Sequence, residues 1–404
     1  MHLRDFRIGW RLLIQAPAYS SAAVAGLMLG FAACFLLLAY VRFCFGFDSQ
    51  VPQAERVYVM KHRLNFVPVP TWIEFMPLPA RSAALDSALA SEVAAVVPLP
   101  VTYEVGAHRF KGEVSAVDPA FAPMFGIVAV EGDLDAALHR PDALALTMAT
   151  ARKLFGTTRA LGNSVLIEGR SYRVLAMLDD APPNTTMPYT ALAGITSALW
   201  PAASRDAAFG QWLGMGGKVY VRLKSGVSAA DMQRALQGAA DNSPWRALAP
   251  PEVIERTGHA MEIALGSLRQ AYFDTEVAGG VRSGPRSNKL AVLALAGVAL
   301  LILALACANY VNLASANALR REREIGIRKL IGAGAARLVR QFVAESVLVA
   351  LLAAALGLLL AWLLLPQFSS LVGADLSGMF DPANVLAALA LSLAVGAAAG
   401  AYPA

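Results

Sequence analysis

Five histidines are the first residues to test for metal binding or acid–base chemistry, because imidazole can do both near neutral pH. None has a partner at a spacing such as HExxH, which places two imidazoles on one face of a helix. We interpret all five as surface or packing residues, at positions His2, His62, His108, His139 and His259. The sequence therefore predicts no metal site.

Carboxylates and nucleophiles give no stronger signal. Asp133 with Asp135, and Asp179 with Asp180, are close enough in sequence to be considered as acid–base pairs. Adjacent acids in loops are usually solvated, however, and the chain has neither a GxSxG nucleophile elbow nor a Walker-type phosphate loop. We predict no catalytic residue, no cofactor and no ATP-hydrolysing phosphate loop in this chain.

The three cysteines do not form a disulfide framework. Cys34 and Cys307 lie inside apolar runs, and Cys44 follows Cys34 at a distance of about 15 Å along what should be one helix. The sequence also lacks CxxC, which argues against a redox or zinc role.

Four apolar runs are each close to the roughly 20 residues that a helix needs to cross a hydrocarbon core. They are Ser20–Val41, Leu290–Asn309, Phe342–Leu365 and Ala383–Ala404. Only the third run contains a charged residue, Glu345 in its first turn, where the helix dipole favours a carboxylate. Because a soluble helix would have a polar face, we predict four transmembrane helices.

The basic residues near the run ends fix the orientation. Arg4, Arg7 and Arg11 precede the first run, and Pro366–Pro382 contains no Lys or Arg. The loop between the second and third runs holds Arg320, Arg321, Arg323, Arg328, Lys329, Arg337 and Arg340. This pattern predicts a multi-pass membrane protein with both basic segments on the cytoplasmic side. It also accounts for the net charge of +5, so we expect no nucleic-acid partner.

The predicted fold is an α-helical membrane protein with four transmembrane helices and a large α+β extracytoplasmic domain between the first and second. Its expected parts are an amphipathic N-terminal helix (1–19), transmembrane helix 1 (20–41), the exported domain (42–289), transmembrane helix 2 (290–313), a cytoplasmic segment (314–341), transmembrane helix 3 (342–365), a short outer loop (366–382) and transmembrane helix 4 (383–404).

The N-terminal arm places Leu3, Phe6, Trp10 and Leu13 on one helical face, so we expect it to lie on the inner membrane surface. The alternative is that its arginines only anchor the first span. That span is longer than the 7 to 15 residues of a signal-peptide core, which favours a retained helix over a cleaved signal.

Short runs rich in β-branched or aromatic residues predict strands in the exported domain. They are Arg56–Lys61, Phe110–Val117, Ser164–Ile167, Tyr172–Leu178, Lys218–Leu223 and Met261–Leu265. Thr147 can cap a helix that stops at Gly156, and Ser228 with Asp231 forms a capping-box pattern. A hairpin turn is expected at Glu168–Arg170.

Small residues recur every four positions in three of the apolar runs, which would let helices approach closely in lipid. They are Ala22, Gly26 and Gly30, then Ala353, Gly357 and Ala361, then Ser392, Gly396, Gly400 and Ala404. The alternative is a composition that is simply rich in Ala and Gly.

Two regions resemble a known family. The stretch LACANYVNLASANALRREREIGIRKLIGA (Leu305–Ala333), followed by LVRQFVAESVL (Leu338–Leu348), resembles FtsX-like and MacB-like ABC transporter permeases. The exported domain resembles the periplasmic core domain of that family in Val117–Gly126, Glu131–Asp133, Ala151–Gly156 and Leu178–Thr185.

The resemblance implies a mechanotransmission permease with two βαβ-rich periplasmic subdomains. A separate cytoplasmic ABC ATPase would bind ATP, and the transport unit would need a second permease copy or second half, with membrane lipids around it. The substrate could be a peptide, antibiotic or lipoprotein. The implied ATPase contact comprises Arg320, Arg321, Arg323, Glu324, Ile325, Gly326, Ile327, Arg328, Lys329, Leu330 and Ile331.

Two further expectations remain open at this point. Relatives continue past a final span of this kind into a basic cytoplasmic tail, so the chain could be truncated or the first half of a duplicated permease. A different class of function is a membrane-anchored sensor whose periplasmic domain binds a ligand and signals through the cytoplasmic helix.

Overall fold

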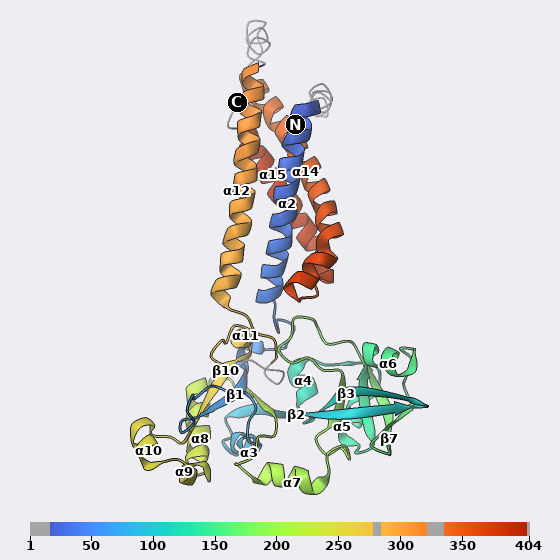
Figure 1. Cartoon of the computed structure of the whole chain (residues 1–404), viewed down its shortest axis with the longest axis vertical. Coiled ribbons are helices and arrows are strands. Elements are labelled where there is room, and N and C mark those ends of the chain that lie inside the picture. The colour runs from blue at the N-terminus through green and yellow to red at the C-terminus, as the bar shows by residue number, and fades with distance from the viewer. Residues whose placement is uncertain (1–16, 278–283, 321–334, 402–404) are drawn as a thin grey trace. The chain divides into compact units, whose positions relative to one another are not determined.

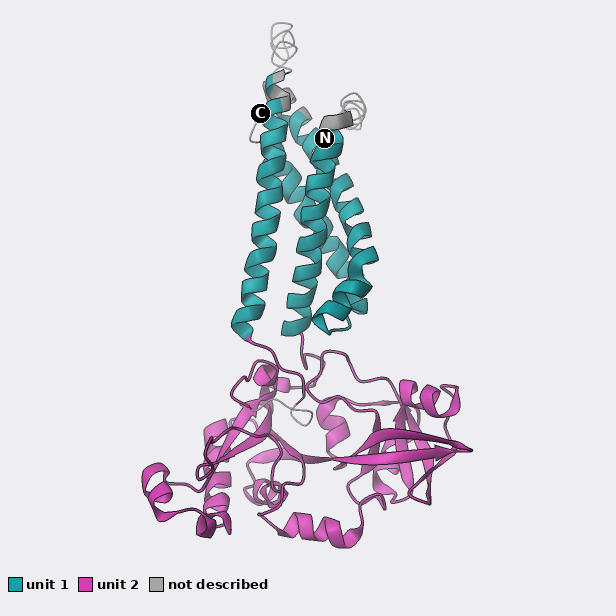
Figure 2. Ribbon diagram, in the orientation of Figure 1, with its two compact units in different colours: residues 1–45, 289–404 teal, residues 46–288 magenta. Residues whose placement is uncertain are grey.

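The computed structural model describes residues 17–277, 284–320 and 335–401, and it divides into two compact units (Figure 2). The helical unit is formed by residues 1–45 and 289–404, and the α/β unit by residues 46–288. The division therefore falls where the first long helix ends and where the second begins.

Four long apolar helices form the described part of the helical unit (Figure 1). They are α2 (Pro17–Phe45), α12 (Lys289–Arg320), α14 (Ala335–Val372) and α15 (Pro382–Ala401), with the short 3-10 helix η2 (Ser377–Phe380) before α15. Their portions of membrane-spanning length and composition are Ser20–Phe45, Lys289–Ala316, Phe342–Val372 and Pro382–Ala401. The predicted set of four transmembrane helices is confirmed.

Helix α2 contacts both α12 and α14, while α15 packs mainly against α14. The side chains buried among these helices are small or aliphatic, and they include Ala23, Leu27, Ala299, Leu303, Val349 and Ala353. Lipid tails are as apolar as these side chains, so close packing stabilises the unit more than burial from water does.

Ten strands form one mixed sheet in the described part of the α/β unit. They are β1 (Val57–Leu64), β2 (Ala90–Val105), β3 (His108–Val117), β4 (Ala129–Gly132), β5 (Ala143–Thr147), β6 (Ser164–Ile167), β7 (Arg170–Leu178), β8 (Ala191–Gly194), β9 (Lys218–Leu223) and β10 (Met261–Ser267). The strand order is β10-β1-β9-β2-β3-β8-β5-β7-β4, and β6 pairs with both β2 and β7. The β3–β8 and β5–β7 pairings are parallel.

Short helices connect and cover these strands. They are η1 (Ala54–Arg56), α3 (Pro79–Asp86), α4 (Phe121–Phe125), α5 (Leu134–His139), α6 (Met148–Phe155), α7 (Ala202–Gly210), α8 (Ala229–Asp241), α9 (Trp245–Leu248), α10 (Pro251–Thr257) and α11 (Leu268–Ala271). The predicted α+β class of the domain is confirmed.

The long strand β2 belongs to two parts of the sheet. Its first half pairs with β9 as far as Val96, and its second half pairs with β3 and, at Tyr103 and Glu104, with β6. Because β6 also pairs with β7, the strands β2-β3-β8-β5-β7-β6 close into a ring. One hydrophobic cluster includes Val114, Leu146 and Tyr172, and another includes Met60, Val219 and Leu236.

Local signals in the sequence are confirmed where the structure describes them. Glu168 and Gly169 both have positive φ and join β6 to β7 as a two-residue hairpin turn. The Thr147 side chain accepts a hydrogen bond from the Thr150 amide, and α6 ends at Gly156. Ser228 and Asp231 form the capping box of α8.

The six predicted strands occur as β1, β3, β6, β7, β9 and β10. The sequence pattern does not reveal β2, because Pro98 and Pro100 argue against a central strand. The structure accommodates both prolines because, among the described pairings, β9 reaches only Val96 and β6 begins at Tyr103. Strands β5 and β8 are buried at every position, so they show no alternation of polar and apolar residues.

Candidate coupling site

The segment that follows α2 is fixed to the loop after β7. Asp48 is completely buried, and its two carboxylate oxygens accept hydrogen bonds from the Thr185 hydroxyl at 2.8 Å and the Thr186 hydroxyl at 2.6 Å. The Asp48 amide donates to the Asn184 carbonyl at 3.0 Å, and the Asn184 side chain donates to the Gly46 carbonyl at 2.8 Å. The first residues of the α/β unit therefore have one defined position on this loop.

The segment that precedes α12 is fixed by a buried arginine. Arg286 forms an ion pair with Glu74 and donates to the carbonyls of Ala271, at 2.6 Å, and Asp274, at 3.0 Å. Only 3% of the Glu74 side chain is exposed, and its other oxygen lies 3.3 Å from Lys218 Nζ. Two ion pairs thus join the end of the α/β unit to the segment before α3 and to the start of β9.

The two segments also meet. Phe47 stacks on Tyr272 with ring centroids 3.6 Å apart, and the Tyr272 carbonyl accepts a hydrogen bond from the Ser287 amide at 2.8 Å. A Cβ built on Gly284 would lie 2.5 Å from the Thr186 carbonyl oxygen, so only glycine allows this approach of the chain. We name Asp48, Glu74, Thr186, Lys218 and Arg286 the junction cluster.

The junction cluster contains two carboxylates and two cations. Burial raises the pKa of Asp48, although the hydrogen bonds from Thr186 and Thr185 oppose this shift. Burial lowers the pKa of Lys218, and the adjacent Glu74 opposes the shift. Removing Glu74 would leave the buried Lys218 and Arg286 without their shared carboxylate, and an unpaired buried charge typically costs about 3–5 kcal/mol. The junction cluster therefore attaches both ends of the α/β unit, near Asp48 and near Arg286, to the rest of that unit.

Small residues bring the helices of the helical unit together as the sequence predicts. A Cβ on Gly30 would lie 2.5 Å from Ala306 Cβ in α12, and one on Gly357 would lie 2.9 Å from the Met28 carbonyl oxygen in α2. A Cβ on Gly396 would lie 2.8 Å from the Val347 Cα. These glycines allow backbone approaches that a larger residue would prevent.

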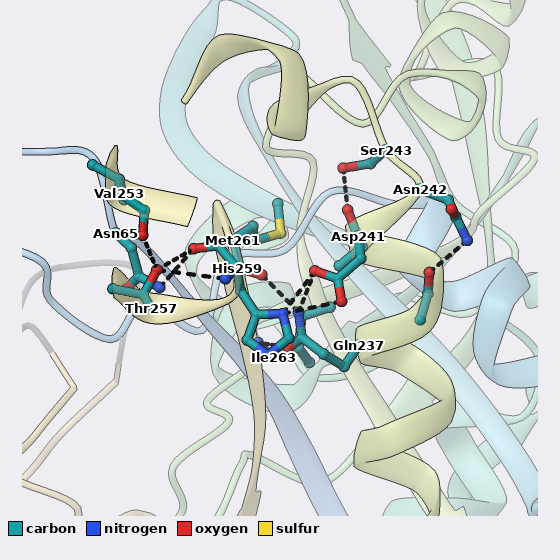
Figure 3. Close-up of polar contacts among 12 residues, drawn as sticks. Asn65, Gln237, Asp241, Asn242, Ser243, Val253, Thr257, His259, Met261 and Ile263 are labelled. Atoms are coloured by element: carbon teal, nitrogen blue, oxygen red, sulfur yellow. Dashed lines mark hydrogen bonds and ion pairs between the residues drawn. The ribbon is translucent and has the colours of Figure 1, made fainter. Parts of the chain in front are cut away.

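His259 lies beside a carboxylate in a structural setting (Figure 3), and the exposed His139 lies 3.3 Å from Asp135. His259 Nδ1 is 2.9 Å from Asp241 Oδ1, and Asp241 also accepts from the Gln237 side chain at 3.0 Å. The nearby Ser243 hydroxyl donates to the Ala240 carbonyl instead of facing the imidazole. The side chains of Gln237, Asp241 and His259 connect α8 to the start of β10. There, Gln237 Oε1 accepts a hydrogen bond from the Ile263 amide at 2.9 Å.

Among the described residues, no three His, Cys, Asp or Glu side chains lie close enough together to hold a metal ion. His62 is completely buried, whereas His108 and His139 are exposed. Asp133 caps α5, and Asp180 accepts a hydrogen bond from the Ala149 amide at 2.8 Å. The two acid pairs therefore have separate local roles.

The predicted ATPase contact falls almost entirely outside the described residues. Helix α12 continues to Arg320, and the remaining contact residues, from Arg321 to Ile331, are not described, as is also true of the N-terminal arm. This contact remains a prediction from sequence.

No sequence pattern predicts the junction cluster. Asn184 and Thr185 were part of a recognised motif, but Asp48, Glu74 and Arg286 carry no pattern of their own. Only the positions of these residues in the sequence point to the cluster. Asp48 follows the first span by three residues, and Arg286 precedes α12 by three.

Comparisons with known proteins agree with this architecture. Residues 20–239 match the MacB-like periplasmic core domain, and residues 296–404 match the FtsX-like permease C-terminal domain. The macrolide export ATP-binding/permease protein MacB of Burkholderia cenocepacia is 25% identical over 281 residues, covering 67% of this chain and 36% of the relative. MacB of Burkholderia pseudomallei is 21% identical over 424 residues, covering 99% of this chain and 58% of the relative.

The crystal structure of the periplasmic region of MacB from Actinobacillus actinomycetemcomitans aligns with 57% of this chain and 97% of its own, at 11% identity and a TM-score of 0.38. The chain spans 36% to 58% of the two curated relatives described above, which are named for both ATP-binding and permease parts. The family matches and the four apolar helices make it a multi-pass inner-membrane protein with a periplasmic segment between its first and second spans. The chain belongs to the family of MacB-like and FtsX-like ABC transporter permeases.

Proposed function

We propose that this chain is the permease of an ABC transporter of the mechanotransmission type. A separate cytoplasmic ATPase hydrolyses ATP, the transmembrane helices relay its movement, and the periplasmic domain changes shape. The work done outside the membrane is export or extraction of a peptide, antibiotic or lipoprotein. The name of the MacB relatives supports export, because it describes macrolide export for those proteins.

The junction cluster is the observation that carries this proposal. The chain leaves α2 at Phe45 and enters α12 at Lys289. Just inside these points Asp48 bonds to Thr186 and Arg286 pairs with Glu74, and Gly284 approaches both Thr186 and Lys218 closely. Because interiors are close-packed and paired buried charges tolerate little displacement, a movement of either helix end should reach the periplasmic sheet. The attachment to β9 through Lys218 provides that route.

The test uses the full chain with the ATPase that co-purifies with it, in lipid nanodiscs. Hydrogen–deuterium exchange is measured with and without ATP for wild type, for Arg286→Met and for Arg140→Met. Arg286→Met removes a member of the junction cluster, whereas Arg140 forms only an exposed ion pair with Asp142. Arg140→Met is therefore the matched control.

We expect ATP to change exchange in β9 and in the 184–186 loop of wild type and Arg140→Met. In Arg286→Met the ATP-dependent change should be confined to the transmembrane helices, while ATP hydrolysis continues. The proposal is contradicted if ATP does not change exchange in the periplasmic sheet of wild type. It is also contradicted if the ATP-dependent change in the sheet is the same in Arg286→Met as in wild type.

A further inference from the structure

A partly open cavity of about 300 Å³ lies in the α/β unit beside the junction cluster. Three neighbouring strands contribute to it in register. Lys218 on β9 is opposite Val96 on β2, and Pro98 on β2 is opposite Ser115 on β3. Since residues opposite one another in a sheet share a face, these side chains form one continuous surface of the cavity.

Phe75 and Met187 complete the apolar part of the lining. The prolines of β2 contribute apolar rings without backbone N–H groups, and Met187 offers a polarizable sulfur that makes favourable contacts with aromatic rings. The volume is at the lower end of the range for ligand pockets, which suits one small aromatic ring with a short polar substituent.

The polar part of the lining consists of Glu113, Ser115, Thr186 and Lys218, of which Ser115 and Lys218 are buried donors. Ser115 is 3% exposed, and its hydroxyl has no hydrogen-bond partner among the described residues. Lys218 is 7% exposed, and Lys218 Nζ lies 3.3 Å from Glu74. The Ser115 hydroxyl faces the cavity and can donate to a group that binds there.

We propose that this cavity binds a small aromatic molecule carrying a carbonyl or carboxylate oxygen. The ring packs on Pro98 and Met187, and the oxygen accepts a hydrogen bond from Ser115 and interacts with the Lys218 ammonium. The inference goes beyond the proposed function, because binding at this site requires neither ATP nor an ATPase.

The probe is 4-fluorophenylacetate, observed by fluorine NMR with the full chain in lipid nanodiscs and with empty nanodiscs as background. Wild type should broaden the probe signal in a saturable manner, and excess unlabelled phenylacetate should reverse the broadening. The neutral 4-fluorotoluene lacks the oxygen acceptor and should bind at least about tenfold more weakly.

Two serine variants locate the site. Ser115→Leu places an isobutyl group in the cavity and should weaken binding by at least about tenfold. Ser171→Leu, at an exposed position on β7, should bind as wild type does. If Ser115→Leu lowers the melting temperature, Ser115→Ala replaces it and should weaken binding about fivefold through loss of one hydrogen bond.

The proposal is overturned by absence of saturable broadening in wild type, or by wild-type binding in the Ser115 variants. Equal binding of 4-fluorotoluene and 4-fluorophenylacetate also overturns it, because the cavity would then select only for apolar character. None of these results depends on coupling to ATP, so the proposed transport function is tested separately.

Discussion

His62 shows how a single side chain can make the stability of the α/β unit depend on pH. It lies on β1 opposite Ile263 of β10, it is 0% exposed, and neither ring nitrogen has a partner among the described residues. Burial lowers the pKa of His62 to about 4, because the apolar surroundings disfavour the charged imidazolium. The folded state therefore binds a proton less readily than the unfolded state, whose histidine pKa is about 6.5.

The contribution of His62 is fully favourable above pH of about 6.5 and is lost as the pH falls towards 4, at a cost of up to about 3 kcal/mol. His62→Leu should raise the melting temperature at pH 7 and reduce its decrease between pH 7 and pH 5.

Thermal unfolding in nanodiscs measures this effect, with His108→Leu at an exposed position as the control. A pH dependence that is identical in wild type and His62→Leu would show that another group controls acid stability.

At the scale of elements, two glycines separate the effect of close packing from that of helix propensity. A Cβ on Gly30 of α2 would lie 2.5 Å from Ala306 Cβ, whereas a Cβ on Gly297 of α12 meets nothing within 4 Å. Gly30→Leu should destabilise the helical unit by about 1–3 kcal/mol through overpacking. Gly297→Leu should be tolerated. Melting temperatures of the two variants in the same lipid test this, and equal values would mean that α2 and α12 do not require close contact.

The cytoplasmic segment gives a second prediction at this scale. Ile327, Leu330 and Ile331 fall at positions i, i+3 and i+4, which would give a helix an apolar strip beside basic residues. If this strip docks on the ATPase, Ile327→Asp with Leu330→Asp should abolish co-purification of the ATPase and preserve membrane insertion.

The matched control places two aspartates at exposed apolar positions of the periplasmic domain, Leu213 and Met215. Recovery of the ATPase at wild-type levels from the Ile327 and Leu330 variant would move the contact elsewhere, with the N-terminal arm as the next candidate.

For the whole molecule, topology can be checked by single cysteines in a background without the three native ones. Ser204 on α7 is exposed, and Leu319 near the end of α12 is 71% exposed. A membrane-impermeant thiol reagent should label Ser204→Cys in spheroplasts and Leu319→Cys only after lysis. Labelling of both in intact spheroplasts would rule out the four-span arrangement.

The amino-acid sequence by itself determined the four spans, their orientation and the α+β domain between the first two. These properties depend on local quantities, since a bilayer requires about 20 consecutive apolar residues and retains Lys and Arg on the inner side. Capping residues such as Thr147 and Ser228 and the Glu168–Gly169 turn are equally local, so their positions agree with the structure. Gly30 and Gly357 each belong to a series of small residues that recurs every four positions, so the sequence also indicates them.

Only the tertiary structure decided how distant residues meet. Strand β2 depends on neighbours that accommodate Pro98 and Pro100, and no window of the sequence contains that information. The junction cluster unites Asp48, Lys218 and Arg286, which are separated by most of the periplasmic domain. Ion pairs of this kind are specified by long-range strand order and by burial, because an isolated charge in the sequence reads as an ordinary surface residue until the fold removes it from water.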